Sequence, residues 1–136
     1  MIGRMSKPKP APVKPAPTVV VVDDDPLQRD EIVDFLVHEG LDVTAVSNGF
    51  AAVHEIRKRS PRVVVMDINM PGLDGIHVAR LLEGVQPRPK LILVSGYPEY
   101  MYRAHQEDIG AFAVIGKPVA LKALARFVRD ALRGAG

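Results

Sequence analysis

Cysteine is absent from the 136 residues of this chain. The absence excludes disulfides, metal sites built on thiolates and catalysis by a cysteine nucleophile. It fits the reducing interior of a cell, and we therefore expect a cytoplasmic protein. The chain also lacks an apolar run of about 18 residues, the shortest that spans a membrane, so no transmembrane helix is expected. No apolar stretch of signal-peptide type follows the basic N-terminus.

Basic residues are scarce in the part of the chain that is expected to fold. The formal net charge is +2, yet residues 1–18 contain four of the 18 Lys and Arg residues and none of the 16 Asp and Glu residues. The remainder therefore carries 14 basic and 16 acidic residues, a net charge of −2. Because a basic face on the fold is not expected, neither is direct binding of DNA or RNA.

Proline is concentrated at the N-terminus, where residues 6–17 (SKPKPAPVKPAP) hold five of the twelve prolines. Such a segment lacks backbone donors and apolar anchors, which predicts an extended, flexible leader over residues 1–17. Its composition favours a solubilising tail, with a docking motif for a partner as the alternative. The length suits one domain, expected over residues 18–133, with a short tail at 134–136.

From residue 18 onward, short β-branched runs alternate with segments of helical spacing. Continuous apolar runs are typical of parallel strands, which helices cover on both faces. The pattern predicts an α/β fold, a doubly wound parallel sheet of five strands with five helices. Strands are expected at residues 19–22, 43–46, 63–65, 91–94 and 113–115, and helices from Pro26 to before Gly40 and at 51–56, 76–82, 100–108 and 119–132.

Polar and charged residues follow four of the five predicted strands, at the point where each strand ends. In order along the chain they are Asp23, Asp24 and Asp25, then Asp67, then Ser95, then Lys117. Ligands of an open α/β sheet bind outside the carboxyl ends of its strands. We therefore expect these side chains to share one pocket.

The chemistry of such a pocket follows from its groups. Clustered carboxylates repel one another unless a cation lies between them, and oxygen ligands without cysteine favour Mg²⁺ or another hard ion over zinc. A carboxylate beside a metal and a lysine can attack phosphorus and become an aspartyl phosphate. A serine hydroxyl can donate a hydrogen bond to the phosphoryl oxygens.

Four segments, VVVVDDD, VVVMDINMPGLDG, LILVSGY and IGKPV, resemble the signature stretches of the response-regulator receiver family in the family's order. The resemblance spans residues 18–133, and Ser95 follows Asp67 by 28 residues and precedes Lys117 by 22. It implies a flavodoxin-like fold with strand order 2-1-3-4-5. It also implies a stand-alone phosphorylation switch of a two-component system.

The resemblance assigns roles to the polar residues at the strand ends. It makes Asp67 the phosphoacceptor, Ser95 the hydroxyl that moves toward the phosphoryl group, and Lys117 the cation that pairs with that group. Pro118 matches the proline after the family's lysine, whose preceding peptide bond is often cis.

For the metal, Mg²⁺ or Mn²⁺, the resemblance implies four ligand residues. They are Asp23, Asp24, Asp67 and the main-chain carbonyl of Asn69, with Asp24 the more direct ligand of the acidic pair. In the following loop, residues 71–75, glycines suit a tight turn.

The family pattern is broken at one position. Receivers often carry an aromatic residue three positions before the lysine, where this chain has Val114. Valine is stiff at χ1 and cannot follow the serine in the same way. We therefore expect output through the loop after Ser95 and the helix that holds Tyr100 and Tyr102. Tyr97 has two interpretations: it lies at the pocket rim and tunes the access of water to the acyl phosphate, or it simply packs.

Other candidates receive structural interpretations. Asp25, before Pro26, fits a helix cap, and Asp74 fits the loop or a helix start. The four histidines, at positions 38, 54, 77 and 105, have no metal-like spacing and are expected at the surface or half-buried.

The expected partners are a histidine kinase or histidine phosphotransferase and an unidentified downstream protein. Because the sequence ends after the fifth helix, no DNA-binding output domain is expected. A relay intermediate and a phosphate sink stay open as alternatives. An enzyme is not expected: an aspartate-nucleophile phosphatase would have a second aspartate where Asn69 stands, and no phosphate-loop or dinucleotide glycine pattern follows the first strand.

Overall fold

The computed structural model describes residues 18–134. The predicted leader at 1–17 and the last two residues lie outside this range, so the predictions for them stay predictions. Strands and helices alternate along the described chain in the order β1 (Val19–Val22), α1 (Pro26–His38), β2 (Val43–Val46), α2 (Gly49–Arg59), β3 (Val63–Asp67), α3 (Gly75–Leu81), β4 (Lys90–Ser95), α4 (Pro98–Gln106), β5 (Ala113–Gly116) and α5 (Leu121–Arg133).

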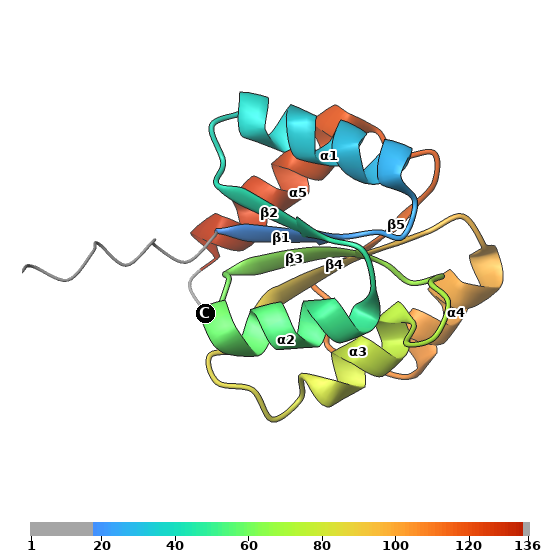
Figure 1. Cartoon of the computed structure of the whole chain (residues 1–136). Helices are drawn as coiled ribbons and strands as arrows, with labels where there is room; N and C mark the ends of the chain where they lie inside the picture. Colours follow the sequence, from blue (N-terminus) through green and yellow to red (C-terminus); the bar gives the residue numbers. More distant parts are fainter. Residues whose placement is uncertain (1–17, 135–136) are drawn as a thin grey trace, which may run out of the picture.

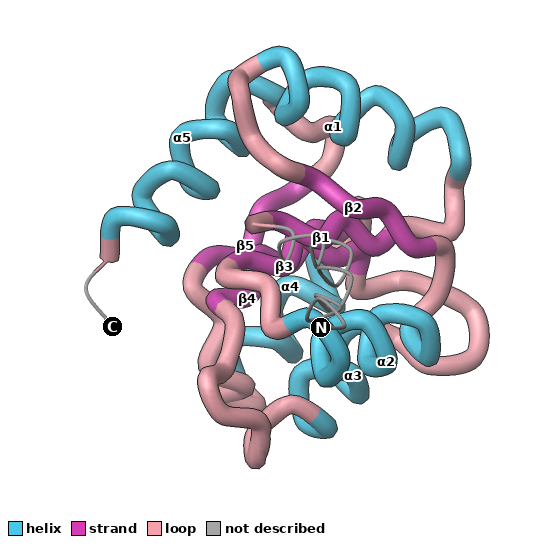
Figure 2. Tube along the Cα trace, turned by 60° about the vertical axis from the view of Figure 1, so that its left-hand side comes forward, coloured by secondary structure: helices cyan, strands magenta, loops and turns pink. Residues whose placement is uncertain are grey.

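The strands form one parallel sheet in the order β2-β1-β3-β4-β5. Helices α1 and α5 cover one face, and α2, α3 and α4 cover the other (Figure 1). Figure 2 shows the strands between these two helical layers. The predicted doubly wound sheet and its strand order are confirmed. Strands are added on one side of β1 first (β2) and then on its other side (β3, β4 and β5), so the strand order reverses between β1 and β3. Folds of this kind bind ligands at that point.

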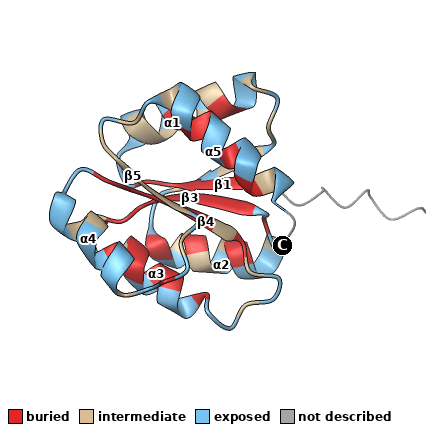
Figure 3. Ribbon diagram, turned by 180° about the vertical axis from the view of Figure 1, so that it is seen from behind, coloured by how far each residue is buried: buried red, intermediate tan, exposed pale blue. Residues whose placement is uncertain are grey.

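The sheet separates two apolar clusters. In β1, Val19 and Val21 pack in the cluster that includes residues of α1 and α5, while Val20 and Val22 pack in the cluster under α2, α3 and α4. All four valines are buried, and Figure 3 shows the same burial along the central strands. Successive side chains of a strand point to opposite faces. A strand covered on both faces is therefore apolar throughout.

Two helices begin at the predicted caps. The Asp25 side chain accepts a hydrogen bond from the N–H of Leu27, and Pro26 occupies the first helical position of α1. The Asp74 side chain accepts from the N–H of His77 at the start of α3. Both contacts satisfy donors that a helix leaves unpaired at its start.

Both predicted bounds of α4 and the predicted start of α5 were wrong by two residues. Helix α4 runs from Pro98 to Gln106 rather than over 100–108, because proline suits a first helical position. Beyond its end, Asp108 has a positive φ of 48° and breaks the helical path. Helix α5 begins at Leu121 rather than 119, after an extended Ala120.

No helix within residues 18–134 is both long enough and apolar enough to cross a membrane. The longest of them, α1 and α5, have 13 residues each. A helix that spans the hydrocarbon core needs about 20 residues.

Candidate functional site

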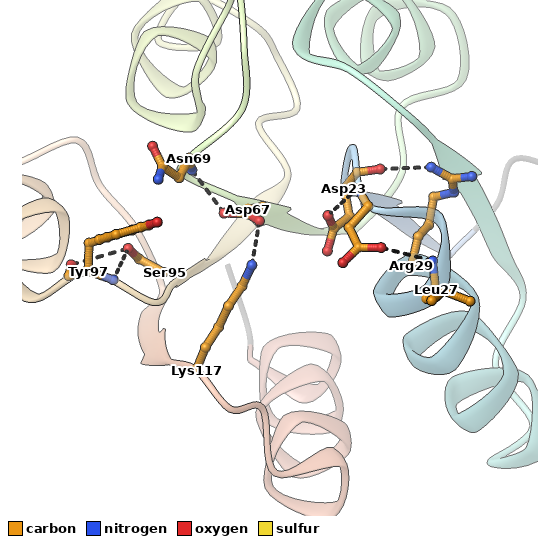
Figure 4. A network of polar contacts seen from close by, with 9 residues as sticks. Asp23, Leu27, Arg29, Asp67, Asn69, Ser95, Tyr97 and Lys117 are labelled. Atoms are coloured by element: carbon orange, nitrogen blue, oxygen red, sulfur yellow. Dashed lines mark hydrogen bonds and ion pairs between the residues drawn. The ribbon is translucent and has the colours of Figure 1, made fainter.

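The carboxyl ends of the strands bring the predicted site residues to one edge of the sheet (Figure 4). Asp67 is the last residue of β3 and Ser95 the last of β4. Asp23 directly follows β1, and Lys117 directly follows β5. The predicted convergence therefore holds in the structure for residues that are far apart in the sequence.

A short ion pair joins β3 to the end of β5. The Nζ of Lys117 donates to Oδ2 of Asp67 at 2.6 Å, and the side chains are 25% and 5% exposed, respectively. The backbone N–H of Asn69 donates to the other oxygen, Oδ1, at 2.9 Å. A carboxylate this buried is costly unless it is paired and hydrogen-bonded. Both oxygens of Asp67 have such a partner, and the carboxylate is held in one orientation.

Three carboxylates lie close together at this edge. One oxygen from each of Asp23, Asp24 and Asp67 lies within 4.8 Å of the others. At that separation, two unit charges repel by roughly 3 kcal/mol with an effective dielectric constant of about 20. Burial raises the pKa of the Asp23 carboxyl, and the charge of Asp67 raises it further, against the opposing effects of the Asp25 N–H and Lys117.

The donor set of this cluster fits a hard divalent cation. It consists of carboxylate oxygens alone, as Mg²⁺, Mn²⁺ and Ca²⁺ prefer. A cation would also offset the repulsion among the three carboxylates. Among residues 18–134, this is the one group of three or more acidic or histidine side chains close enough to hold an ion. The predicted role of the Asn69 carbonyl as a further ligand stays a prediction.

An open pocket of about 420 Å³ lies over the cluster. Its lining includes Asp24, Asp67 and Lys117. Gln28, which the sequence did not single out, also lines it. Asn69 and Tyr97 form further parts of the wall. Tyr97 is 50% exposed, and its ring packs edge-to-face on Tyr100. Tyr97 therefore lies at the rim and also packs, and its predicted effect on water stays a prediction.

The hydroxyl of Ser95 is engaged away from Asp67. Ser95 is fully buried. Its Oγ accepts a hydrogen bond from the N–H of Tyr97 at 3.0 Å and donates one to the carbonyl of Tyr97 at 3.2 Å. Tyr97 is the residue that precedes the first turn of α4. The hydroxyl thus ties the end of β4 to the start of α4.

The remaining modulating positions lie on or after β5. Val114 is half-buried, pairs with Leu93 in the ladder and packs against the cluster under α2, α3 and α4. The peptide bond between Lys117 and Pro118 is cis, as the resemblance implied. The roles predicted for both residues in switching stay predictions.

Glycine is required in the loop that follows Asp67. A Cβ on Gly75 would lie 2.8 Å from the Cα of Ile68 and 2.9 Å from the carbonyl oxygen of Asp67, too close for any side chain. Gly72 has a φ of +80°, which favours glycine. The glycines therefore let α3 begin directly against the backbone of the site.

Sequence reasoning missed one contact of the acidic site. Nη1 of Arg29, from the start of α1, donates to the main-chain oxygen of Asp23 at 2.9 Å. A basic residue so near a helix N-terminus interacts unfavourably with the helix dipole. This unusual position of Arg29 was the one feature of the sequence that could have indicated the contact. The four histidines are all exposed, as expected.

Comparison with known proteins identifies the class to which this fold and site belong. A family model described as the response regulator receiver domain matches residues 19–129. The chain belongs to this family, whose members act in two-component systems. Phosphorylation and Mg²⁺ are general features of the family.

Individual relatives agree with the family match. The positive alginate biosynthesis regulatory protein of Pseudomonas aeruginosa is 36% identical over 119 residues, covering 85% of this chain and 47% of the relative. The DNA-binding transcriptional activator EvgA of Escherichia coli is 27% identical over 116 residues, covering 85% and 57%. The solved signal receiver domain of NarL from Mycobacterium tuberculosis aligns with a TM-score of 0.77 and 30% identity, covering 90% of this chain and all of that one.

The chain spans about half the length of the curated relatives that it matches. EvgA is named as DNA-binding. The expectations of a stand-alone receiver and of no DNA binding therefore gain no support from the relatives, and they stay predictions.

Proposed function

We propose that this chain is a phosphoacceptor switch in which Asp67 receives a phosphoryl group from a histidine kinase or a histidine phosphotransferase. The observation that carries the proposal is the buried Asp67 carboxylate, paired with Lys117 at 2.6 Å and next to two further carboxylates. A purely structural ion pair does not explain Asp23 and Asp24, which only add repulsion.

In the proposed step, a carboxylate oxygen of Asp67 forms a bond to phosphorus while the P–N bond of the donor phosphohistidine breaks. The imidazole nitrogen keeps the electron pair of that bond. Negative charge on the phosphoryl oxygens falls next to the Lys117 ammonium, whose flexible stem lets it turn from the carboxylate to the new group. Positioning and charge neutralisation provide most of the catalysis in such transfers.

A divalent cation held by Asp23, Asp24 and Asp67, with the Asn69 carbonyl as a further ligand, would supply additional neutralisation of the phosphoryl oxygens. Mg²⁺ and Mn²⁺ both suit these donors. Asp23 is buried with a raised pKa and its carboxylate accepts the N–H of Asp25, whereas Asp24 is exposed. We therefore assign Asp24 as the more direct ligand of the pair.

Output is proposed to begin at Ser95. To donate to a phosphoryl oxygen, its hydroxyl must give up the hydrogen bond that it donates to the Tyr97 carbonyl at the start of α4. Phosphorylation would thereby loosen this end of α4. Because Val114 cannot act as an aromatic switch, residues 96–110 are the proposed route to a downstream protein. Amide chemical shifts of 96–110 that stay unchanged on binding of a phosphoryl analogue would refute this route.

The output of the phosphorylated receiver depends on which molecule it contacts. We propose signalling through protein contacts, with a relay intermediate or phosphate sink as alternatives, and no catalysis on other substrates. The DNA-binding relative EvgA favours a second candidate, control of an attached output domain in a longer protein.

Acetyl phosphate provides a direct test of the acceptor. With Mg²⁺ present, intact-protein mass spectrometry should show one added phosphoryl group, and none with EDTA. Asp67→Asn should abolish the addition. Asp25→Asn, which removes the same charge beside the same pocket but keeps a helix cap, is the matched control and should be labelled normally. Labelling that survives Asp67→Asn would refute the assignment.

A further inference from the structure

Arg29 reaches from α1 to the backbone of the acidic site. Its Nη1 donates to the main-chain oxygen of Asp23 at 2.9 Å, in a partly buried position. None of the ion pairs among residues 18–134 includes Arg29. Figure 4 shows the Asp23 carbonyl directed toward Arg29, while Asp67 lies on the other side of Asp23. The guanidinium therefore binds the backbone of the site and not its carboxylates.

The carbonyl that Arg29 holds belongs to the peptide between Asp23 and Asp24. The Asp23 N–H donates to the carbonyl of Val46 at 3.2 Å, and its carboxylate accepts the N–H of Asp25 at 2.9 Å. Within the Asp23–Asp24 peptide itself, the hydrogen bond from Arg29 holds the carbonyl. Because the peptide is planar, this bond favours one orientation of the whole unit. Its orientation sets the direction in which the exposed Asp24 side chain leaves the backbone toward Asp67.

We propose that Arg29 is a positioning residue, which holds the Asp23–Asp24 peptide so that Asp24 is ready to bind a divalent cation. This inference rests on the proposed function. Arg29 acts through the Asp23 carbonyl and does not touch the reacting groups. Its charge and its position have opposite effects on the site. Loss of the charge alone would strengthen cation binding, whereas loss of the positioning would weaken it.

The substitution Arg29→Met sets these effects against each other, because it keeps an unbranched stem but removes both the charge and every donor. We expect the Mg²⁺ affinity, measured by isothermal titration calorimetry, to fall about tenfold, as is typical when a residue that supports a metal ligand is removed. The rate of labelling by acetyl phosphate should recover when Mg²⁺ is raised to saturation. Arg126→Met, the same change at an exposed position of α5, is the matched control and should bind Mg²⁺ like the wild type.

Several outcomes would overturn the inference. An Arg29→Met affinity equal to or tighter than that of the wild type would do so, whether or not the variant is less stable to heat. If Arg29→Met does not fold, Arg29→Lys keeps the charge without the planar fork of donors, and its expected affinity is at least threefold weaker. Wild-type affinity in Arg29→Lys would then reject the role.

The wild-type protein separates this inference from the proposed function. A wild type that neither binds Mg²⁺ nor becomes phosphorylated would refute both. A wild type that does both, next to an Arg29→Met variant with unchanged affinity, would refute the role of Arg29 alone.

Discussion

The pairing of Lys117 with Asp67 predicts a large and specific coupling between these two residues. Removal of the ammonium by Lys117→Met leaves a carboxylate that is 5% exposed beside two others. A hydrogen bond to a charged group contributes about 1.5–3 kcal/mol, and the partial exposure of Lys117 places the expected loss of unfolding free energy near 2 kcal/mol. For a domain of this size, that corresponds to a fall in Tm of roughly 8 °C.

The same structure predicts a different result when Asp67 is changed first. Asp67→Asn removes one of three clustered negative charges, so this variant should be at least as stable as the wild type without metal. In the Asp67→Asn background, Lys117→Met should cost only about 0.5 kcal/mol, because no buried carboxylate is left unpaired. The coupling energy is therefore expected to be about 1.5 kcal/mol.

The measurement is a double-mutant cycle by urea unfolding, followed by far-UV circular dichroism in EDTA at low salt. Distant, independent sites add within about 0.5 kcal/mol. A coupling energy below that value would refute the reasoning, since the short contact would then contribute no more than two unrelated residues.

Three further predictions concern the metal, the pH dependence and the loop. Mg²⁺ at about 100 times its Kd should stabilise the wild type by about 2.7 kcal/mol, and Asp24→Asn should lose most of this gain in thermal unfolding. The pKa of Asp23 is raised in the folded state above its ordinary 3.8, so the metal-free fold binds this proton more tightly than the unfolded chain and loses stability as the pH rises above that value. Asp23→Asn should therefore be more stable than the wild type at pH 7, and the difference in unfolding free energy should shrink toward acid pH. An equal difference at neutral and acid pH would contradict the assignment of this effect to the Asp23 carboxylate. Gly75→Ala should cost about 1–3 kcal/mol through overpacking, whereas Gly84→Ala, where an added Cβ meets nothing within 4 Å, should change stability little.

The first turn of α4 shows where interpretation of the sequence reached its limit. The central strands β1, β3 and β4 were predicted well because their apolar runs are buried on both faces, which leaves a continuous apolar stretch in the sequence. The segment of α4 is polar, and its few apolar residues do not mark where the helix begins and ends. Its start was decided by Pro98, and its end by the positive φ of Asp108 and the turn that follows.

The sequence by itself determined the sheet, the caps at Asp25 and Asp74, and the edge at which the acidic residues and Lys117 meet. These follow from local propensity and from the rule that parallel strands end at the same side of the sheet. Only the tertiary structure decided that Arg29 binds the Asp23 carbonyl and that Ser95 holds Tyr97. Such contacts depend on how neighbouring segments pack and on side-chain rotamers, which the pattern of residues along a chain does not specify.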